Sequence, residues 1–204
     1  MDRRDCQDVR MANQDGRLID SVQEAFGAFA EPQRTALTRT WVSALDQLRG
    51  AEQCIAWGMP SLRVDGDLVL SLQGFAQHNS VFPGPGVIER LTKELAGSTI
   101  TKGTIHFDRD KPMKPSLVKT IVRARVDEIN ESYPKSSGVF KEFYGNGVLK
   151  SRGRMKAGEL HGSWEWFRRD GTIKRSGSFT SGRQVGTWTT YDDSGQPYKE
   201  TTFD

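Results

Sequence analysis

The last third of the chain consists of three similar segments. They are GVFKEFYGNGVLKSRGRMKAGELH at residues 138–161, GSWEWFRRDGTIKRSGSFTSGRQV at 162–185 and GTWTTYDDSGQPYKETTFD at 186–204. Glycines and large apolar residues recur in them every 24 residues: Gly138, Gly162 and Gly186; Gly147, Gly171 and Gly195; Phe140, Trp164 and Trp188; Phe143, Phe167 and Tyr191; Met155, Phe179 and Phe203. A fixed period of this length indicates a stacked array in which each unit buries apolar surface against its neighbours.

Each copy is expected to form two short strands joined by a tight turn. Asn146-Gly147, Asp170-Gly171 and Ser194-Gly195 are typical hairpin turn pairs at equivalent places. Ser181-Gly182 is expected to turn the chain into the next copy. Residues 138–204 are therefore predicted to form a meander of β-hairpins with aromatic residues in rows one repeat apart.

Composition indicates a soluble globular protein with one or two domains. Of 204 residues, 35% are hydrophobic and 27% are charged. Apolar runs are too short for a transmembrane helix, the charged N-terminus predicts no secretory signal, and the two cysteines make no disulfide framework. We therefore expect a cytoplasmic protein.

Residues 15–133 are predicted to form an α+β domain, an antiparallel sheet covered by helices. Apolar spacing predicts helices over 18–29, 37–48, 87–95 and 115–129. Strands are expected at 62–64 and 68–72, joined by an Asp65-Gly66 turn, and at 74–82 and 99–107. Pro134, Ser136 and Ser137 interrupt both patterns and place the domain boundary between 131 and 137.

Several short motifs in this first part carry a family resemblance. They are Trp57-Gly58-Met59-Pro60, His78, Phe82-Pro83-Gly84-Pro85-Gly86, Lys102-Gly103-Thr104-Ile105 and Asp110-Lys111-Pro112. In order and approximate spacing they resemble the YdhG-like family of bacterial domains, although Trp57 and His106 depart from its pattern. The resemblance implies a frataxin-like architecture and an iron-chaperone role.

Two stretches contain the carboxylate and imidazole groups that ferrous iron accepts as ligands. Asp20 and Glu24 share one face of the first helix, near Asp15. On a strand, His106, Asp108 and Asp110 would point to the same side. Both sets also have an interpretation without metal: a solvated helix face, and a polar turn whose neighbours Arg109, Lys111 and Lys114 oppose a cation.

A ligand pocket in the same domain is a further hypothesis. Lys102 and Thr104 are expected on one strand face, where they could hold a small anion. The residues expected around such a pocket are Trp57, Met59, Phe75, His78, Phe82, Lys102 and Thr104. The alternative is that these are core and turn residues.

The 24-residue copies resemble the MORN repeat, in the variant class found in YwqK-type antitoxin-like proteins. Trp164, Trp188, Phe167 and Tyr191 fall on its aromatic positions. The resemblance implies a scaffolding, protein-binding or lipid-associated module, and we expect these repeats to contact another macromolecule. Residues 134–204 carry 12 basic and 8 acidic side chains, so an acidic partner is compatible with them.

A basic stripe is the predicted partner-binding surface, and the alternative is that these charges only keep the sheet soluble. Its residues are Lys150, Arg152, Arg154, Arg168, Arg169, Lys174 and Arg175, of which Arg152, Arg154, Arg168, Arg169 and Lys174 are the predicted partner contacts. We expect the aromatic side chains to form the core, which disfavours nucleic acid because bases stack on displayed rings.

The sequence therefore predicts a non-enzymatic binding protein. Its first domain would bind a small ligand or a metal ion, with iron implied by the family, and its repeats would bind an unidentified protein. One alternative is a pure interaction or antitoxin-like module without a ligand. The other is an enzyme of small molecules that uses Lys102 and His78.

Overall fold

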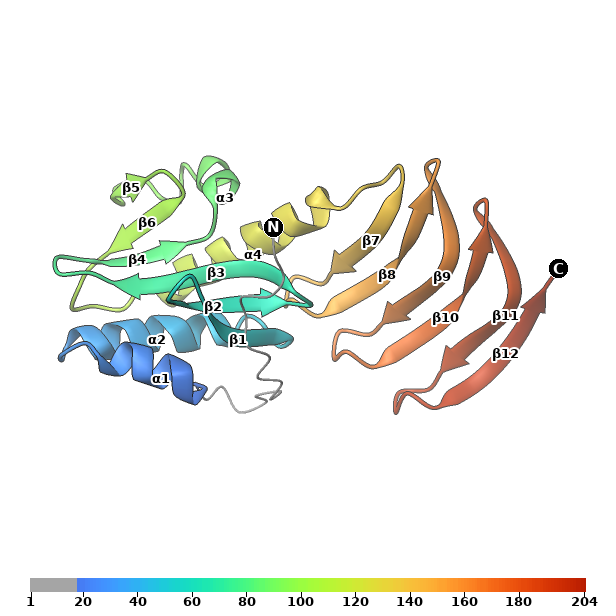
Figure 1. Cartoon of the computed structure of the whole chain (residues 1–204), viewed down its shortest axis with the longest axis horizontal. Coiled ribbons are helices and arrows are strands. Elements are labelled where there is room, and N and C mark those ends of the chain that lie inside the picture. The colour runs from blue at the N-terminus through green and yellow to red at the C-terminus, as the bar shows by residue number, and fades with distance from the viewer. Residues whose placement is uncertain (1–17) are drawn as a thin grey trace. The chain divides into compact units, whose positions relative to one another are not determined.

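The computed structural model describes residues 18–204, so Asp15 and the predicted domain start at residue 15 lie outside the described residues. The chain divides into two compact units, of which the first ends at Glu128 and the second comprises Ile129–Asp204. The division falls within helix α4 (Pro115–Ser132). Figure 1 shows the helices and strands of both units.

The first unit combines helices with a six-stranded antiparallel sheet. Its other helices are α1 (Asp20–Gly27), α2 (Gln33–Leu45) and α3 (Pro85–Arg90). The strands are β1 (Ala51–Ala56), β2 (Met59–Val64), β3 (Asp67–Gly74), β4 (Asn79–Phe82), β5 (Ile100–Thr101) and β6 (Thr104–Phe107), in the order β1-β2-β3-β4-β6-β5. The predicted mixture of helices and antiparallel strands is confirmed.

Trp41 lies at the centre of the first unit's core. It is fully buried on α2, meets Phe26 of α1 edge to face at 5.8 Å, and donates its indole N–H to Gln53 Oε1 at 2.9 Å. Together with Ile121 of α4 and Leu72 of β3 it lines one small interior void. Helices α2 and α4 therefore pack over the same apolar face of the sheet.

Three details of the predicted sheet were wrong. Strand β1 was not predicted; it pairs with β2 across a turn at Trp57-Gly58. The single strand expected over 74–82 is the end of β3, a connection over 75–78, and β4. The strand expected over 99–107 is the hairpin β5–β6, because Gly103 takes a φ of 80° and turns the chain there.

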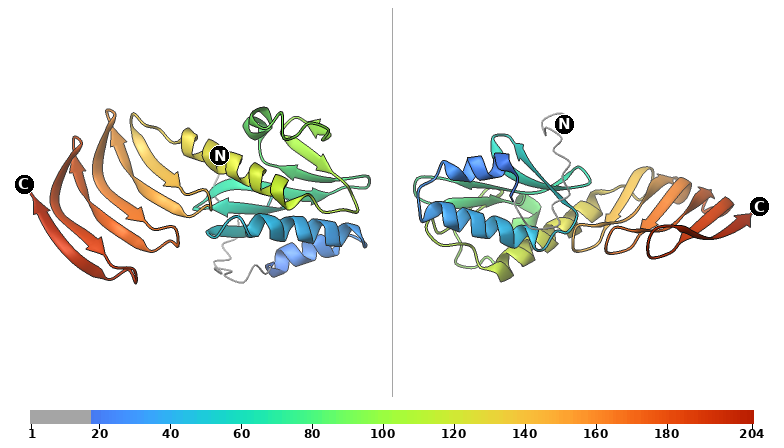
Figure 2. Two further views of the ribbon diagram at one scale, coloured as in Figure 1. Left: turned by 180° about the vertical axis from the view of Figure 1, so that it is seen from behind. Right: turned by 90° about the horizontal axis from the view of Figure 1, so that it is seen from below.

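The second unit is a six-stranded antiparallel meander in which every strand pairs with its neighbours in sequence. Its strands are β7 (Gly138–Phe143), β8 (Leu149–Lys156), β9 (Glu159–Phe167), β10 (Ile173–Thr180), β11 (Arg183–Tyr191) and β12 (Pro197–Phe203). They form a single layer in both views of Figure 2. The second sheet fits the hairpin meander that the 24-residue period predicted.

Two indole rings of this sheet pack directly against glycines that lie inside strands. Trp164 lies against Gly153 and Trp188 against Gly177, so closely that a Cβ on either glycine would overlap the indole ring. Both tryptophans are almost completely buried, and Phe179 meets Trp188 edge to face at 5.0 Å. The core of the unit is therefore a row of aromatic side chains along one sheet, with glycine permitting the close approach.

Candidate functional sites

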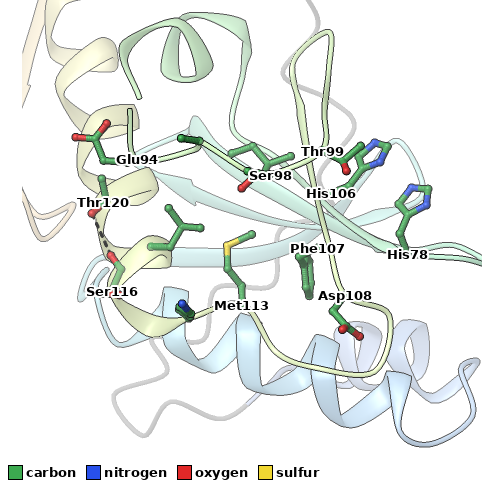
Figure 3. Close-up of a pocket in the computed structure, with 15 residues that line it drawn as sticks. His78, Glu94, Ser98, Thr99, His106, Phe107, Asp108, Met113, Ser116 and Thr120 are labelled. Atoms are coloured by element: carbon green, nitrogen blue, oxygen red, sulfur yellow. Dashed lines mark hydrogen bonds between the residues drawn. The ribbon is translucent and has the colours of Figure 1, made fainter. Parts of the chain in front are cut away.

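An open groove of about 850 Å³ in the first unit is lined by residues from separate parts of the sequence. One end is formed by His78 and His106, and the other by Glu94, Ser116 and Thr120 (Figure 3). Phe107 and Met113 lie between the two ends. The volume is within the range of small-molecule sites, and the lining combines an apolar middle with polar ends.

The two histidines at one end form a parallel stack. Their ring centroids are 4.0 Å apart with an interplanar angle of 9°, and Phe75 stacks on His78 at 5.2 Å. His106 Nε2 also lies 3.3 Å from the hydroxyl of Thr101. Loss of contact with water, followed by the charge of His78, lowers the pKa of His106 below its ordinary value of 6.5.

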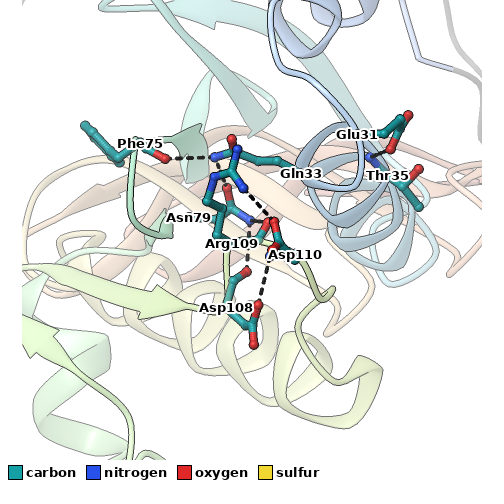
Figure 4. Close-up of polar contacts among 8 residues, drawn as sticks. All are labelled: Glu31, Gln33, Thr35, Phe75, Asn79, Asp108, Arg109 and Asp110. Atoms are coloured by element: carbon teal, nitrogen blue, oxygen red, sulfur yellow. Dashed lines mark hydrogen bonds and ion pairs between the residues drawn. The ribbon is translucent and has the colours of Figure 1, made fainter.

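A buried polar network holds the loop at this end of the groove (Figure 4). Gln33 Nε2 donates to Phe75 O and to Asn79 Oδ1, both at 2.9 Å. Asn79 Nδ2 in turn donates to the carbonyl oxygens of Asp108 at 3.0 Å and Arg109 at 2.9 Å. The network joins α2, the 75–78 connection and the loop after β6, so it fixes the segment that carries Asp108.

Of the seven residues predicted around a ligand pocket, only His78 lines this groove. Lys102 is exposed in the β5–β6 turn and Thr104 is buried on β6, so the prediction that they share one strand face was wrong. Trp57 is 57% exposed in the β1–β2 turn. Met59 on β2 and Phe82 on β4 are half-buried. Phe75 does not line the groove, but it stacks on His78, which does.

The five predicted metal ligands are divided among three places. Asp20 and Glu24 are exposed on α1, whereas His106 and Asp108 line the groove. Asp110 contacts Arg109 at 2.9 Å and donates its backbone N–H to Asp108 Oδ1. Within residues 18–204, no three His, Cys, Asp or Glu side chains lie together as a set that could hold a metal ion.

His78→Phe is expected to raise the pKa of His106 part of the way toward 6.5. The ring stack is retained while the charge of His78 is removed, and the effect of burial remains. Because the pKa of His106 is lowered in the folded protein, the unfolded chain binds a proton at this residue more readily. Protonation of His106 therefore favours unfolding: the folded state has its full stability above pH 6.5 and loses part of it as the pH falls below that value.

Titration of the imidazole signals by NMR measures this pKa directly. His161→Phe, in the second unit, is the control variant and should leave the pKa of His106 unchanged. An unchanged pKa of His106 in His78→Phe would show that the charge of His78 does not act on it.

A second recess, of about 360 Å³, lies in the C-terminal sheet. The residues around it are Tyr144, Lys150, Trp166, Phe167, Lys174, Arg175, Phe179, Gln184 and Trp188. We call it the aromatic–basic pocket. It has three cationic side chains and no carboxylate in its lining.

The cations of this pocket differ in their partners. Lys150 is paired with Glu142 at 2.7 Å. The guanidinium of Arg175 lies over the Trp188 ring at 4.4 Å, and within the part of the chain that the structure describes neither Arg175 nor Lys174 has an acidic partner. Two positive charges are thus available at an aromatic recess.

Three residues of the predicted basic stripe line the pocket: Lys150, Lys174 and Arg175. Arg168 instead donates to the carbonyl oxygens of Ile173 and Tyr191 and pairs with Asp193, so it links neighbouring repeats. Arg152 pairs with Glu165 and lies over the Phe167 ring.

Arg169 and Arg154 also lie outside the pocket lining. Arg169 lies over the Tyr144 ring at 5.4 Å, and Arg154 accepts the Trp164 indole N–H with its backbone oxygen at 3.2 Å.

Trp166 was not predicted to take part in binding, whereas Arg175 belonged to the predicted basic stripe. The signal that could have found Trp166 is its departure from the repeat, because the equivalent residues 24 positions away are Glu142 and Thr190. The repeat itself does not require an indole there. Trp166 stacks between Trp164 and Trp188, at 5.6 Å from each.

Comparison with known proteins supports part of the prediction for the repeats and part of the prediction for the first domain. A family model described as a MORN repeat variant matches residues 137–157 and 184–204. These segments flank residues 158–183, which include most of the second copy and contain Trp166, Lys174 and Arg175. No curated protein matches the chain.

A solved structure is similar to part of the chain. It is the crystal structure of a protein of the DUF1801 family (YdhG) from Bacillus subtilis, with 18% identity and a TM-score of 0.51 over 55% of this chain and 94% of that one. This likeness supports the mixed helix and antiparallel-sheet fold. The frataxin-like architecture, the iron role and the YwqK-type class stay predictions.

No helix in residues 18–204 is long and apolar enough to cross a membrane.

Proposed function

We propose that the protein is a non-enzymatic binding protein whose C-terminal repeats hold a macromolecular partner. The match to the MORN repeat variant supports an interaction role. Repeat arrays of this kind expose an extended surface, because each unit contacts only its neighbours.

The observation that carries the proposal is the aromatic–basic pocket. A sheet that needs its charges only for solubility would be expected to distribute them around an aromatic core. Here Lys174 and Arg175 border a recess walled by aromatic rings, with no acidic side chain in its lining. Tryptophan, tyrosine and arginine are also the residue types that contribute most to the binding energy of protein interfaces.

Affinity capture with the full chain tests the role of the repeats. The double variant Lys174→Glu with Arg175→Glu is expected to lose the partner that the unaltered protein captures from an extract of its source cells. Reversing two charges at one contact replaces attraction by repulsion, which costs several kcal/mol in typical interfaces.

The matched control reverses Arg183 and Lys199, which are exposed on the same sheet but do not line the pocket. It should capture the same partner as the unaltered protein. Equal capture by both double variants would place the partner elsewhere, and no specific capture by the unaltered protein would remove the proposal.

The groove of the first unit supports a second role, the binding of a small molecule. Its volume and its polar ends, with an imidazole pair at one and Glu94 at the other, are those of a ligand site. The imidazole titration described above also reports ligand occupancy, because a ligand at that end changes the environment of both rings.

The two alternative functions are affected differently by the structure. A pure interaction module, antitoxin-like and without a ligand, would use the aromatic–basic pocket and leave the groove empty. An enzyme that uses His78 together with Lys102 is less well supported, because His78 lines the groove and Lys102 lies in a turn outside its lining.

A further inference from the structure

The aromatic–basic pocket has features that restrict the chemistry of its occupant. The repeats account for aromatic residues at the positions of Trp164 and Trp188, but not for Trp166, whose equivalents are Glu142 and Thr190. Trp166 is partly exposed and lines the recess. The second copy thus carries an extra indole beside Lys174 and Arg175, neither of which has an acidic partner among residues 18–204.

The charges point to an anionic occupant. Lys174 is exposed, and Arg175 is held over the Trp188 ring, so its guanidinium is positioned before any partner binds. A guanidinium in a fixed position binds a carboxylate with two parallel hydrogen bonds at a small loss of conformational freedom. The Gln184 side chain adds a neutral amide to the same lining.

The arrangement of the rings disfavours nucleic acid. In proteins that bind single-stranded nucleic acid, the bases stack on the free faces of aromatic side chains. In this pocket Trp166 is stacked at 5.6 Å against Trp164 on one side and Trp188 on the other, and the Trp188 ring also carries Arg175. The ring faces are occupied by protein groups, and a recess remains for an apolar side chain.

The form of the pocket also disfavours a lipid bilayer. Proteins that bind to a bilayer surface insert protruding apolar groups among the lipids. Here no aromatic side chain of the lining is fully exposed, and Phe179 and Trp188 are each less than a tenth exposed. A recess of about 360 Å³ receives a group from the partner instead of inserting one into it.

We propose that the aromatic–basic pocket binds a short acidic segment of a protein, with one aromatic side chain of that segment in the recess and its flanking carboxylates on Lys174 and Arg175. This inference rests on the proposed interaction role of the repeats. It adds the chemistry of the partner and the position at which it is recognised.

Titration of the full chain with synthetic peptides tests this inference. The probe is the peptide Glu-Asp-Glu-Phe-Asp-Glu, and binding is followed by the indole N–H signals of the tryptophans in NMR spectra. Saturable shifts of the Trp166 and Trp188 signals are expected, with affinity that falls as salt is added. Replacing the central Phe of the peptide by Ala should weaken binding about tenfold, as for loss of an anchor side chain.

Two variants locate the site. Arg175→Gln keeps a polar side chain but removes its charge, and it is expected to weaken peptide binding about tenfold because a charge-assisted pair is lost. Trp166→Thr introduces the residue that the third copy has at this place and should remove the preference for Phe over Ala. Arg183→Gln, outside the pocket lining, is the control and should bind normally. Thermal unfolding of each variant shows that the sheet is retained.

Each other outcome overturns the inference. Peptide binding that Arg175→Gln and Trp166→Thr leave unchanged would place the acidic segment elsewhere. Absence of peptide binding, or tighter binding of a single-stranded oligonucleotide or of vesicles containing phosphatidylserine, would assign a different partner class. If the capture experiment still finds a partner that depends on Lys174 and Arg175, the interaction role stands without this chemistry.

Discussion

Gly177→Ala is expected to destabilise the C-terminal sheet by about 3 kcal/mol, at the upper end of the usual cost of overpacking. The added Cβ would overlap carbons Cδ2 and Cε2 of the Trp188 indole. That ring cannot easily move, because it is 2% exposed and Phe179 packs against its side at 5.0 Å. Urea unfolding followed by tryptophan fluorescence measures the change.

Two other glycines make a graded control series. Gly162 has open space for a Cβ but a φ of 69°, so Gly162→Ala should cost about 1 kcal/mol from backbone conformation alone. Gly27 at the end of α1 has open space and no positive φ, and Gly27→Ala should change stability by less than about 1 kcal/mol. If Gly177→Ala were as stable as Gly27→Ala, the close contact of glycine and indole would not exist.

The repeat period predicted the meander because glycines recur at its hairpin turns. Gly147, Gly171 and Gly195 each lie in the turn between two strands. The role of Gly153 and Gly177 could not be predicted in the same way, although they too are 24 residues apart. They lie inside strands, and the pairing of β8 with β9 shifts register between Arg152 and Arg154. The pairing of β10 with β11 shifts in the same way between Ser176 and Ser178, and only these register shifts show that the two glycines lie beneath indole rings.

The residues of the groove were predicted one by one but not together. His78 was assigned to a ligand pocket, and His106 and Asp108 to a metal site. They meet because β4 pairs with β6, which brings the connection before β4 beside the end of β6. Periodicity gives the strands, but their order in the sheet depends on long-range pairing that one sequence does not reveal.

The basic residues of the repeats show a similar limit. A cluster of cations in the sequence does not tell which of them bind their own neighbours. Arg168 and Arg152 pair with carboxylates of the same sheet, whereas neither Lys174 nor Arg175 has an acidic partner in the described part of the chain. The division follows from the positions of Asp193 and Glu165 across the strands, which only the structure supplies.

Asn79→Ala is expected to destabilise the first unit by about 3 kcal/mol, because it leaves several buried polar groups without partners. Asn79 is fully buried and makes three hydrogen bonds: one from Gln33 and two to the backbone oxygens of Asp108 and Arg109. Its removal should also loosen the loop that carries Asp108. Faster hydrogen exchange of the Asp110 backbone N–H, which donates to Asp108 Oδ1, would report that loosening.

The neighbouring residue provides a matched control. Ser80 is 1% exposed on the same strand, yet its hydroxyl oxygen has no hydrogen-bond partner in the described part of the chain. Ser80→Ala removes a buried polar group that makes no bond, so stability should be unchanged or should rise by up to about 1 kcal/mol. Equal destabilisation by both substitutions would mean that the cost comes from lost packing in β4. A large difference shows that the polar network, and not the volume of the side chain, holds the histidine end of the groove in place.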